Sequence, residues 1–183
     1  MISKAQIESM RGRQADLAET QALKAELAAL RQTRNPLFLT FEDLEKILAW
    51  KLGRQIGRQR EKRLENTDEL IRKVTGLALS VRHKDPEYEL ELRVQIICAL
   101  RGVGMGVASA VLALVFPDQY AVIDFRGWRQ LFDEEKTIFS ISDYARYMGR
   151  LRPLAAELGW PVQEVDHAIW EFDRLLDSHG TER

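Results

Sequence analysis

The stretch from Leu100 to Ala108 has the composition of a turn that could hold a phosphate group. Its glycines stand between two apolar segments, and the apolar-x-Gly-apolar-Gly spacing is typical of a tight turn between two helices. Bare backbone N–H groups at the start of the second helix form a site for an anion. The residues expected to contact DNA phosphates here are Arg101, Gly102, Val103, Gly104, Met105 and Gly106. The glycines are equally compatible with a purely structural corner, so both interpretations stay open at this point.

A single acid, Asp124, follows this turn at a distance of 22 residues from Gly102. It comes directly after an apolar, extended-looking segment, Ala121-Val122-Ile123, and before an aromatic- and arginine-containing stretch. A fixed carboxylate in a pocket of low polarity stabilises an oxocarbenium-like sugar, which is the transition state of N-glycosidic cleavage. An aspartate in front of a helix also caps that helix. The two roles are compatible in one residue.

The combined pattern of hairpin, apolar helix, proline-containing loop and aspartate resembles the helix-hairpin-helix-GPD superfamily of base-excision DNA glycosylases. The close resemblance covers about residues 88–132. The matching positions are Leu100, Gly102, Val103, Gly104, Asp124, Trp128 and Arg129. The resemblance implies a helix-hairpin-helix at about residues 88–116 and double-stranded DNA as the partner. It also implies that Asp124 stabilises the cationic sugar and positions the attacking nucleophile.

The sequence departs from this superfamily at one chemically important position. Bifunctional members carry a lysine two residues after the second hairpin glycine, where this chain has Gly106, and no lysine occurs between Lys84 and Lys136. The resemblance therefore implies a monofunctional DNA glycosylase that hydrolyses the bond to a damaged or modified base with an activated water. Lys51 could reach the pocket from another helix. A second departure, Val122-Ile123 in place of Pro-Val, affects the expected shape of the loop.

Aromatic and basic residues suggest how a base and a phosphate backbone would be held. Trp50, Lys51 and Trp128 are candidates for a base pocket, because base-flipping enzymes enclose the extruded base between apolar walls. Core packing is the alternative for both tryptophans, and it is the preferred interpretation of Trp170 and Phe172. The chain's densest basic run spans residues 51–63. Within that run Arg54 and Arg58 are expected to contact phosphates, together with Arg129, unless these residues form an ordinary solvated surface.

The elements that must position these residues all have the periodicity of helices, so the expected fold class is all-α, with a helix-hairpin-helix glycosylase-like body. Residues 1–34 are expected to form an N-terminal helical extension, with one helix over about 3–32, and residues 35–183 the glycosylase-like domain. The N-terminal helix could also bind a protein partner. Helix starts are indicated at Thr40, at Asp85-Pro86 and at Pro161. Asp166 and His167 of the last helix are further pocket candidates, although solvation or a favourable charge at the helix start also explains Asp166.

Composition excludes several other classes of protein. The chain has 183 residues and a formal net charge of −1, so it has no uniformly basic coat, although a local basic face is compatible with this value. A single cysteine, Cys98, excludes an internal disulfide and an iron–sulfur cluster with four cysteine ligands. No metal site or cofactor is expected, apart from a monovalent cation that could bind at the hairpin. A cytoplasmic protein without a membrane segment is expected, associated with the nucleoid if it binds DNA. The competing hypothesis is a non-catalytic protein that binds DNA or a protein partner with the same fold.

Overall fold

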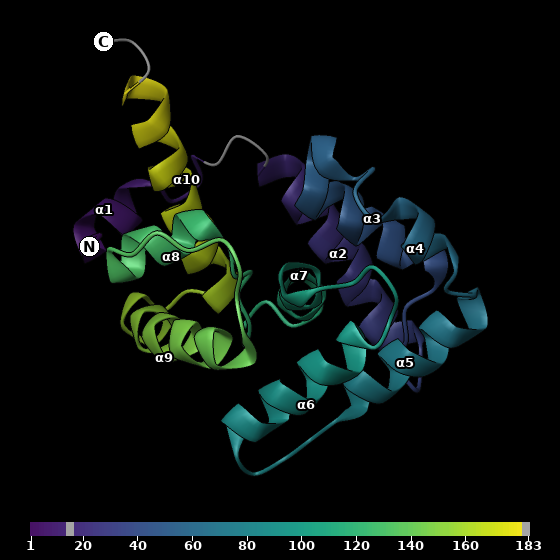
Figure 1. The fold of residues 1–183 in the computed structure, drawn as a ribbon. Helices are drawn as coiled ribbons and strands as arrows, with labels where there is room; N and C mark the ends of the chain where they lie inside the picture. Colours follow the sequence, from purple (N-terminus) through teal and green to yellow (C-terminus); the bar gives the residue numbers. More distant parts are fainter. Residues whose placement is uncertain (14–16, 181–183) are drawn as a thin grey trace.

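A computed structural model describes residues 1–13 and 17–180, and within these ranges the chain is entirely helical, as the sequence predicts, with no strand. Figure 1 shows the arrangement. In chain order the α-helices are α1 (Lys4–Ser9), α2 (Leu17–Thr33), α3 (Phe41–Leu52), α4 (Arg60–Leu64), α5 (Asp68–Ser80), α6 (Pro86–Cys98), α7 (Met105–Val115), α8 (Phe125–Phe132), α9 (Ile141–Leu158) and α10 (Val162–Gly180). A short 3₁₀ turn, η1 (Gly53–Gln55), follows α3.

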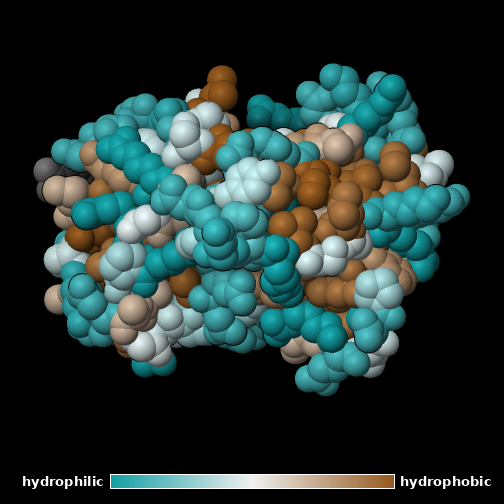
Figure 2. Space-filling view, turned by 90° about the horizontal axis from the view of Figure 1, so that it is seen from below, coloured by the Kyte–Doolittle hydropathy of each residue, from teal (hydrophilic) through white to brown (hydrophobic). Residues whose placement is uncertain are grey.

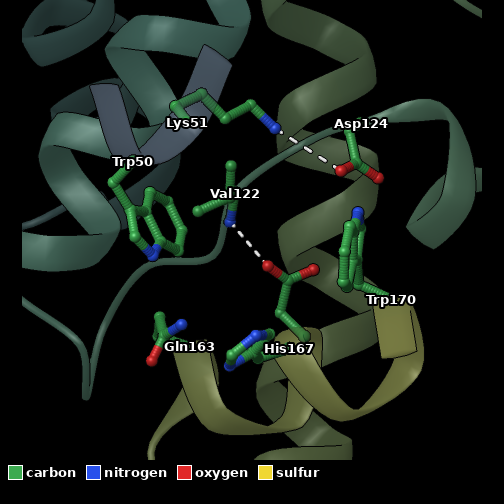
Figure 3. A pocket seen from close by; sticks show the side chains of 8 residues that line it. Trp50, Lys51, Val122, Asp124, Gln163, His167 and Trp170 are labelled. Carbon is green, nitrogen blue, oxygen red and sulfur yellow. Dashed lines mark hydrogen bonds and ion pairs between the residues drawn. The ribbon is translucent and has the colours of Figure 1, made fainter. Parts of the chain in front are cut away.

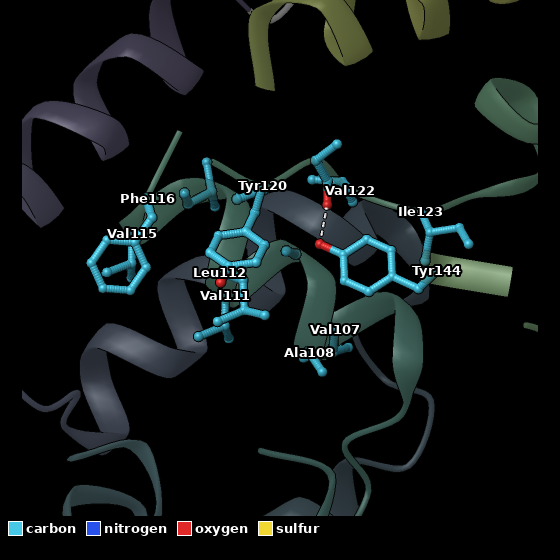
Figure 4. Close-up of a cluster of buried hydrophobic side chains, with 14 of the residues drawn as sticks. Val107, Ala108, Val111, Leu112, Val115, Phe116, Tyr120, Val122, Ile123 and Tyr144 are labelled. Atoms are coloured by element: carbon cyan, nitrogen blue, oxygen red, sulfur yellow. Dashed lines mark hydrogen bonds between the residues drawn. The ribbon is translucent and has the colours of Figure 1, made fainter. Parts of the chain in front are cut away.

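Helix α7 is the centre of the fold. Every residue from Val107 to Val115 is buried, and a helix that is apolar all round is a core helix. Helices α2, α3, α6 and α10 pack against it, and Figure 1 shows it end-on between the two halves of the molecule. Side chains of α7 meet Tyr120 and Tyr144 in one continuous apolar cluster (Figure 4). The hydroxyl of Tyr144 donates a hydrogen bond of 2.7 Å to the carbonyl of Ala121, which fixes the loop that leads to Asp124.

Helices α2 to α6 lie on one side of α7, and α1 lies with α8, α9 and α10 on the other side (Figure 1). The loop from Tyr120 to Asp124 runs between the two halves. Its residues Ala121, Val122 and Ile123 are all buried there. Val122 donates its backbone N–H to Asp166 of α10, and Ile123 donates to Ser109 of α7. This extended loop therefore brings Asp124 to the place where both halves of the fold meet.

Several helix starts follow the local signals in the sequence. The capping box at Thr40 and Asp43 is confirmed at the start of α3. Asp85 caps α6 in front of Pro86, as its position predicts. A further capping box, formed by Ser140 and Asp143, begins α9. These caps set the entry angles of the helices that surround the core.

The N-terminal segment differs from the single helix expected over residues 3–32. It forms two helices, α1 and α2, and residues 14–16 between them lie outside the described part of the chain. Ile7 of α1 and Leu27 of α2 are buried in the core, and α1 packs on α10 while α2 packs on α7. Helices α1 and α2 therefore both contribute apolar side chains to the core of the fold.

The surface seen from below has an apolar area on the side where Figure 1 places α5 and α6 (Figure 2). The large exposed apolar residues of α5 are Leu70 and Leu77. None of the residues expected to act on DNA belongs to this helix. Among the described helices, none is long and apolar enough to cross a membrane.

Candidate active site

A cavity of about 100 Å³ lies between the end of α3, the loop before α8 and the first half of α10. At about 30 Å³ for each water molecule of the liquid, this volume corresponds to roughly three water molecules. Figure 3 shows the side chains around it. The lining residues are Trp50, Lys51, Val122, Asp124, Gln163, Asp166, His167 and Trp170.

The two carboxylate oxygens of Asp124 have different contacts: Oδ1 caps a helix, and Oδ2 faces the cavity wall. Oδ1 accepts hydrogen bonds from the backbone N–H groups of Arg126 at 3.1 Å and Gly127 at 3.0 Å, so the predicted capping of α8 is confirmed. Oδ2 points away from the helix and lies 3.4 Å from Nζ of Lys51. The cap thus holds the carboxylate in one orientation and leaves its second oxygen at the cavity wall.

Lys51 reaches the site from the last turn of α3. A Cβ atom at Gly106, had there been one, would lie 3.9 Å from Cε of Lys51. The amine of Lys51 therefore occupies the neighbourhood of position 106, although the chain has no lysine in the hairpin itself. Lys51 and Asp124 also line an open groove on their other side, at the N-terminus of α7, together with Met105, Gly106, Ile123, Phe125, Thr137, Ile138 and Phe139.

Two tryptophans form opposite walls of the cavity, as Figure 3 shows. Trp50 is anchored by a hydrogen bond of 2.8 Å from its Nε1 to Oγ1 of Thr20 in α2. Trp170 projects from α10 on the other side and lines the cavity, so its interpretation as a core residue was wrong. The helical spacing of Trp170 on α10 is equally typical of core and pocket residues, and the sequence does not separate these two cases.

Trp128, the other tryptophan expected in a base pocket, lies in the core instead. Its exposed fraction is 0%, and its ring packs against Phe132, Phe139 and Tyr147. It does not line the cavity, because α8 turns that side chain toward α9. A base cannot stack on Trp128 in this arrangement.

Asp166 forms the deepest acidic group of the cavity. The backbone N–H of Val122 donates to Oδ2 at 2.9 Å, and the hydroxyl of Tyr147 donates to Oδ1. Burial raises the pKa of Asp166 to about 7, and the negative charge of Asp124 acts in the same direction. Both the protonated and the charged form of Asp166 are therefore populated at neutral pH.

The glycine turn between α6 and α7 forms as expected, but its residues have different surroundings. Gly102 has a positive φ of 72°, and a Cβ there would lie 2.7 Å from Cγ of Arg63, so this face packs against α4. Val103 is buried in the core. Gly104, by contrast, is exposed and has no atom near its missing side chain. Of the predicted contact set, the start of α7 at Gly104 is the part that remains open to a phosphate.

The predicted basic contacts separate into two groups. Arg54 and Arg58 are exposed, and Arg101 is exposed while it pairs with Glu65. Arg129 is held by carboxylates: its Nε and Nη2 donate to Asp173 at 3.0 and 2.7 Å. The contacts to Asp173, Glu135 and Asp177 raise the pKa of Arg129 above its ordinary value. Arg129 therefore stabilises the packing of α8 on α10, and this arrangement contradicts its assignment as a phosphate contact.

A comparison of the sequence with protein-family models, with curated proteins and with solved structures finds no match. The described residues contain no group of three or more histidine, cysteine or acidic side chains that could hold a metal ion. The function is inferred from the chemistry of the site itself.

Proposed function

We propose that this chain is a monofunctional DNA glycosylase that acts on a damaged or modified base extruded from double-stranded DNA. The observation that carries the proposal is the position of Asp124. Its fixed carboxylate stands at the edge of a cavity of about 100 Å³ whose walls include two tryptophans. An extruded base between Trp50 and Trp170 would place the attached sugar outside the cavity, toward the Lys51–Asp124 pair and the groove beyond it.

In the proposed reaction, the bond between C1′ of the sugar and the ring nitrogen of the base breaks, and the base leaves with the electron pair. Oδ2 of Asp124 stabilises the positive charge that develops on the sugar. A water molecule then adds to C1′, and Asp124 accepts the proton that this water loses and releases it to solvent. The departing base takes up one proton from solvent, so the step consumes one water and leaves Asp124 ionised again. Lys51 keeps Oδ2 at the cavity edge through the ion pair at 3.4 Å.

The start of α7 supports binding of the DNA backbone. Gly104 leaves the first N–H groups of this helix uncovered, and Met105 and Gly106 line the same groove as Lys51 and Asp124. Arg54, three residues after Lys51, is exposed on η1 and adds a positive charge near that end of α3. A phosphate at the helix start would thus lie next to the site of sugar chemistry.

The experiment that tests this proposal measures base release from duplexes that each carry one damaged or modified base, with alkaline cleavage of the abasic product as the readout. Wild-type protein should release at least one base, and Asp124→Asn should release none, while it keeps its fold because asparagine caps a helix as well as aspartate does. Release at the wild-type rate by Asp124→Asn would contradict the role of this carboxylate.

The alternative is a non-catalytic DNA-binding or partner-binding protein on the same fold. The same experiment separates the two, because such a protein would bind duplexes in a salt-dependent way and release no base from any of them.

A further inference from the structure

Gln163, at the start of α10, is a buried polar side chain that borders the cavity, and only 1% of its surface is exposed. Its backbone N–H donates to the carbonyl of Pro117 at 3.0 Å, which fixes the residue in place. Nζ of Lys24 in α2 lies 3.0 Å from the side-chain oxygen Oε1. Lys24 also pairs with Glu164 at 3.3 Å, so its ammonium group is held behind Gln163.

This contact determines which end of the amide faces the cavity. A lysine ammonium can only donate hydrogen bonds, so the atom next to Lys24 must be the amide oxygen. The amide nitrogen Nε2 is then the end that points into the cavity, as Figure 3 shows. Among the described residues, Nε2 has no hydrogen-bond partner, although the side chain is almost fully buried. Nε2 can therefore donate to an acceptor on a molecule that fills the cavity.

Several neighbouring polar atoms are already engaged. Both oxygens of Asp166 accept hydrogen bonds, from Val122 and from Tyr147, and Nε1 of Trp50 donates to Thr20. Lys51 stands at the opposite end of the cavity, at Asp124. Gln163 therefore has a donor left for the edge of a ring held between the two tryptophans.

From this geometry we infer that Gln163 is a specificity-determining residue, and that the cavity selects a base with an exocyclic oxo group on the edge that enters first. This inference rests on the proposed function and names its substrate class. An oxo group would accept the hydrogen bond from Nε2, whereas an amino group at the same position would set one donor against another and leave both unsatisfied. Deaminated and oxidised bases belong to the favoured class.

The test uses pairs of bases that differ by oxo against amino at one position, namely hypoxanthine against adenine and uracil against cytosine, in otherwise identical duplexes. Two quantities are measured: the rate of base release, and the affinity for duplexes in which a 2′-fluorine on the target nucleotide prevents release. Wild type should favour the oxo member of at least one pair by about tenfold or more, the value of one hydrogen bond between neutral groups plus the cost of an unsatisfied donor.

Two variants test whether the side-chain amide of Gln163 causes the preference for the oxo base. Gln163→Glu has the same shape and keeps the contact with Lys24, but it presents an acceptor to the cavity, so it should lose the preference for the oxo base or reverse it. Gln163→Leu removes the donor and should treat both bases alike. The control Gln95→Glu, on the exposed face of α6, should behave like wild type. Thermal unfolding of each variant shows that it is folded.

Each outcome decides between the two proposals. Base release without an oxo preference overturns the role of Gln163 and leaves the glycosylase proposal intact. A preference in affinity without any release supports the role of Gln163 and overturns the glycosylase proposal. Neither release nor a difference in affinity overturns both, and a preference that survives in Gln163→Glu overturns the assignment to this residue.

Discussion

Oδ2 of Asp124 lies 3.4 Å from Nζ of Lys51, although the two residues are 73 positions apart in the chain. Asp124 begins α8 in one half of the molecule, and Lys51 ends α3 in the other half. The side chains keep only 18% and 15% of their surface exposed, so the pair is largely shielded from water. It connects the two halves at the point where the enclosed cavity meets the open groove at the start of α7.

Removal of the Lys51 amine should have a larger effect on the rate of base release than on the free energy of unfolding. We expect Lys51→Met to lower the rate of base release by about ten- to a hundredfold, because Oδ2 of Asp124 loses the contact that orients it. The free energy of unfolding should fall by about 1–2 kcal/mol, between the values for exposed and buried ion pairs. The checks are single-turnover kinetics and denaturant unfolding, with Lys62→Met on the exposed basic run as the control. An unchanged rate in Lys51→Met would remove Lys51 from the site.

Borohydride treatment during the reaction tests the proposal that the chain is a monofunctional glycosylase. The chain has no lysine in the hairpin, and Lys51 is engaged in the ion pair with Asp124. Hydrolysis by water leaves no imine between protein and sugar, so we expect no covalent protein–DNA adduct on a denaturing gel. An adduct that disappears in Lys51→Met would show that this amine attacks the sugar and that the enzyme is bifunctional.

Gly127 of α8 allows the close approach of Tyr147 of α9. A Cβ at position 127 would lie 1.9 Å from the hydroxyl oxygen of Tyr147, which donates to Asp166. We therefore expect Gly127→Ala to lower the free energy of unfolding by about 1–3 kcal/mol, the usual cost of overpacking. Gly149→Ala, on α9, is the control, since nothing lies near its missing side chain. It should raise stability by up to about 1 kcal/mol.

A double variant tests whether the hydroxyl group is the cause. Tyr147→Phe removes the oxygen that a Cβ at Gly127 would meet. The loss caused by Gly127→Ala should accordingly be smaller in the Tyr147→Phe background than in wild type, as measured by urea unfolding. Equal losses in both backgrounds would mean that another contact limits the space around α8.

The sequence predicts most of the helices because their ends carry local signals. Thr40 with Asp43, Asp85 before Pro86, and Asp124 before Phe125 are caps whose geometry depends only on neighbouring residues. The division of the N-terminal segment into α1 and α2 was missed although the sequence carries a local signal, because Gly12 follows the end of α1 with a positive φ of 72°. Ile7 and Leu27 then pack in the core through different helices.

The site was only partly predictable. Asp166 and His167 of α10 were pocket candidates and line the cavity, whereas Gln163 and Trp170 of the same helix were not expected there. Asp124, Trp50 and Lys51 stand out by type and spacing, and all three line the cavity. Gln163 has no distinctive neighbour in the sequence, and its contact with Lys24 spans 139 positions. Such long-range pairings cannot be read from a single sequence. The misplacement of Trp128 has the same origin, because the face that α8 turns to the core is set by α9.

The buried carboxyl group of Asp166 should make stability depend on pH. Its pKa in the folded chain is about 7, above the ordinary value of 3.8, so the folded state binds more protons than the unfolded state between these two values. The free energy of unfolding should therefore fall as the pH rises from about 4 to about 7 through this contribution. Asp166→Asn keeps the neighbouring charged groups, Asp124 and Lys51, but has no carboxyl group at position 166. The free energy of unfolding of this variant should therefore lack the pH-dependent contribution of Asp166. Urea unfolding of both proteins from pH 5 to 8 provides the comparison, and parallel pH profiles would contradict it.

The basic run after α3 should divide into contacts with DNA and contacts within the protein. Arg54 and Arg58 are exposed, so Arg54→Gln and Arg58→Gln should each reduce the slope of log affinity against log salt by about 1. Arg63 is 3% exposed and donates to the carbonyl groups of Ile56 and Arg58, so Arg63→Gln should lower stability instead. Arg129→Gln should also act on stability, through Asp173. Fluorescence anisotropy at several salt concentrations, together with thermal unfolding, checks both groups. Unchanged salt slopes in Arg54→Gln and Arg58→Gln would exclude these residues from DNA binding.

The most direct test of the central claim is the single-turnover rate of base release by wild type and Asp124→Asn on the duplex that wild type processes best. Asparagine keeps an oxygen for the N–H groups of Arg126 and Gly127, so the cap of α8, the unfolding temperature and DNA affinity should stay close to wild type. The negative charge beside the departing base is lost, and the rate should fall by at least about a thousandfold. Wild-type rates in a folded, DNA-binding Asp124→Asn protein would contradict the account.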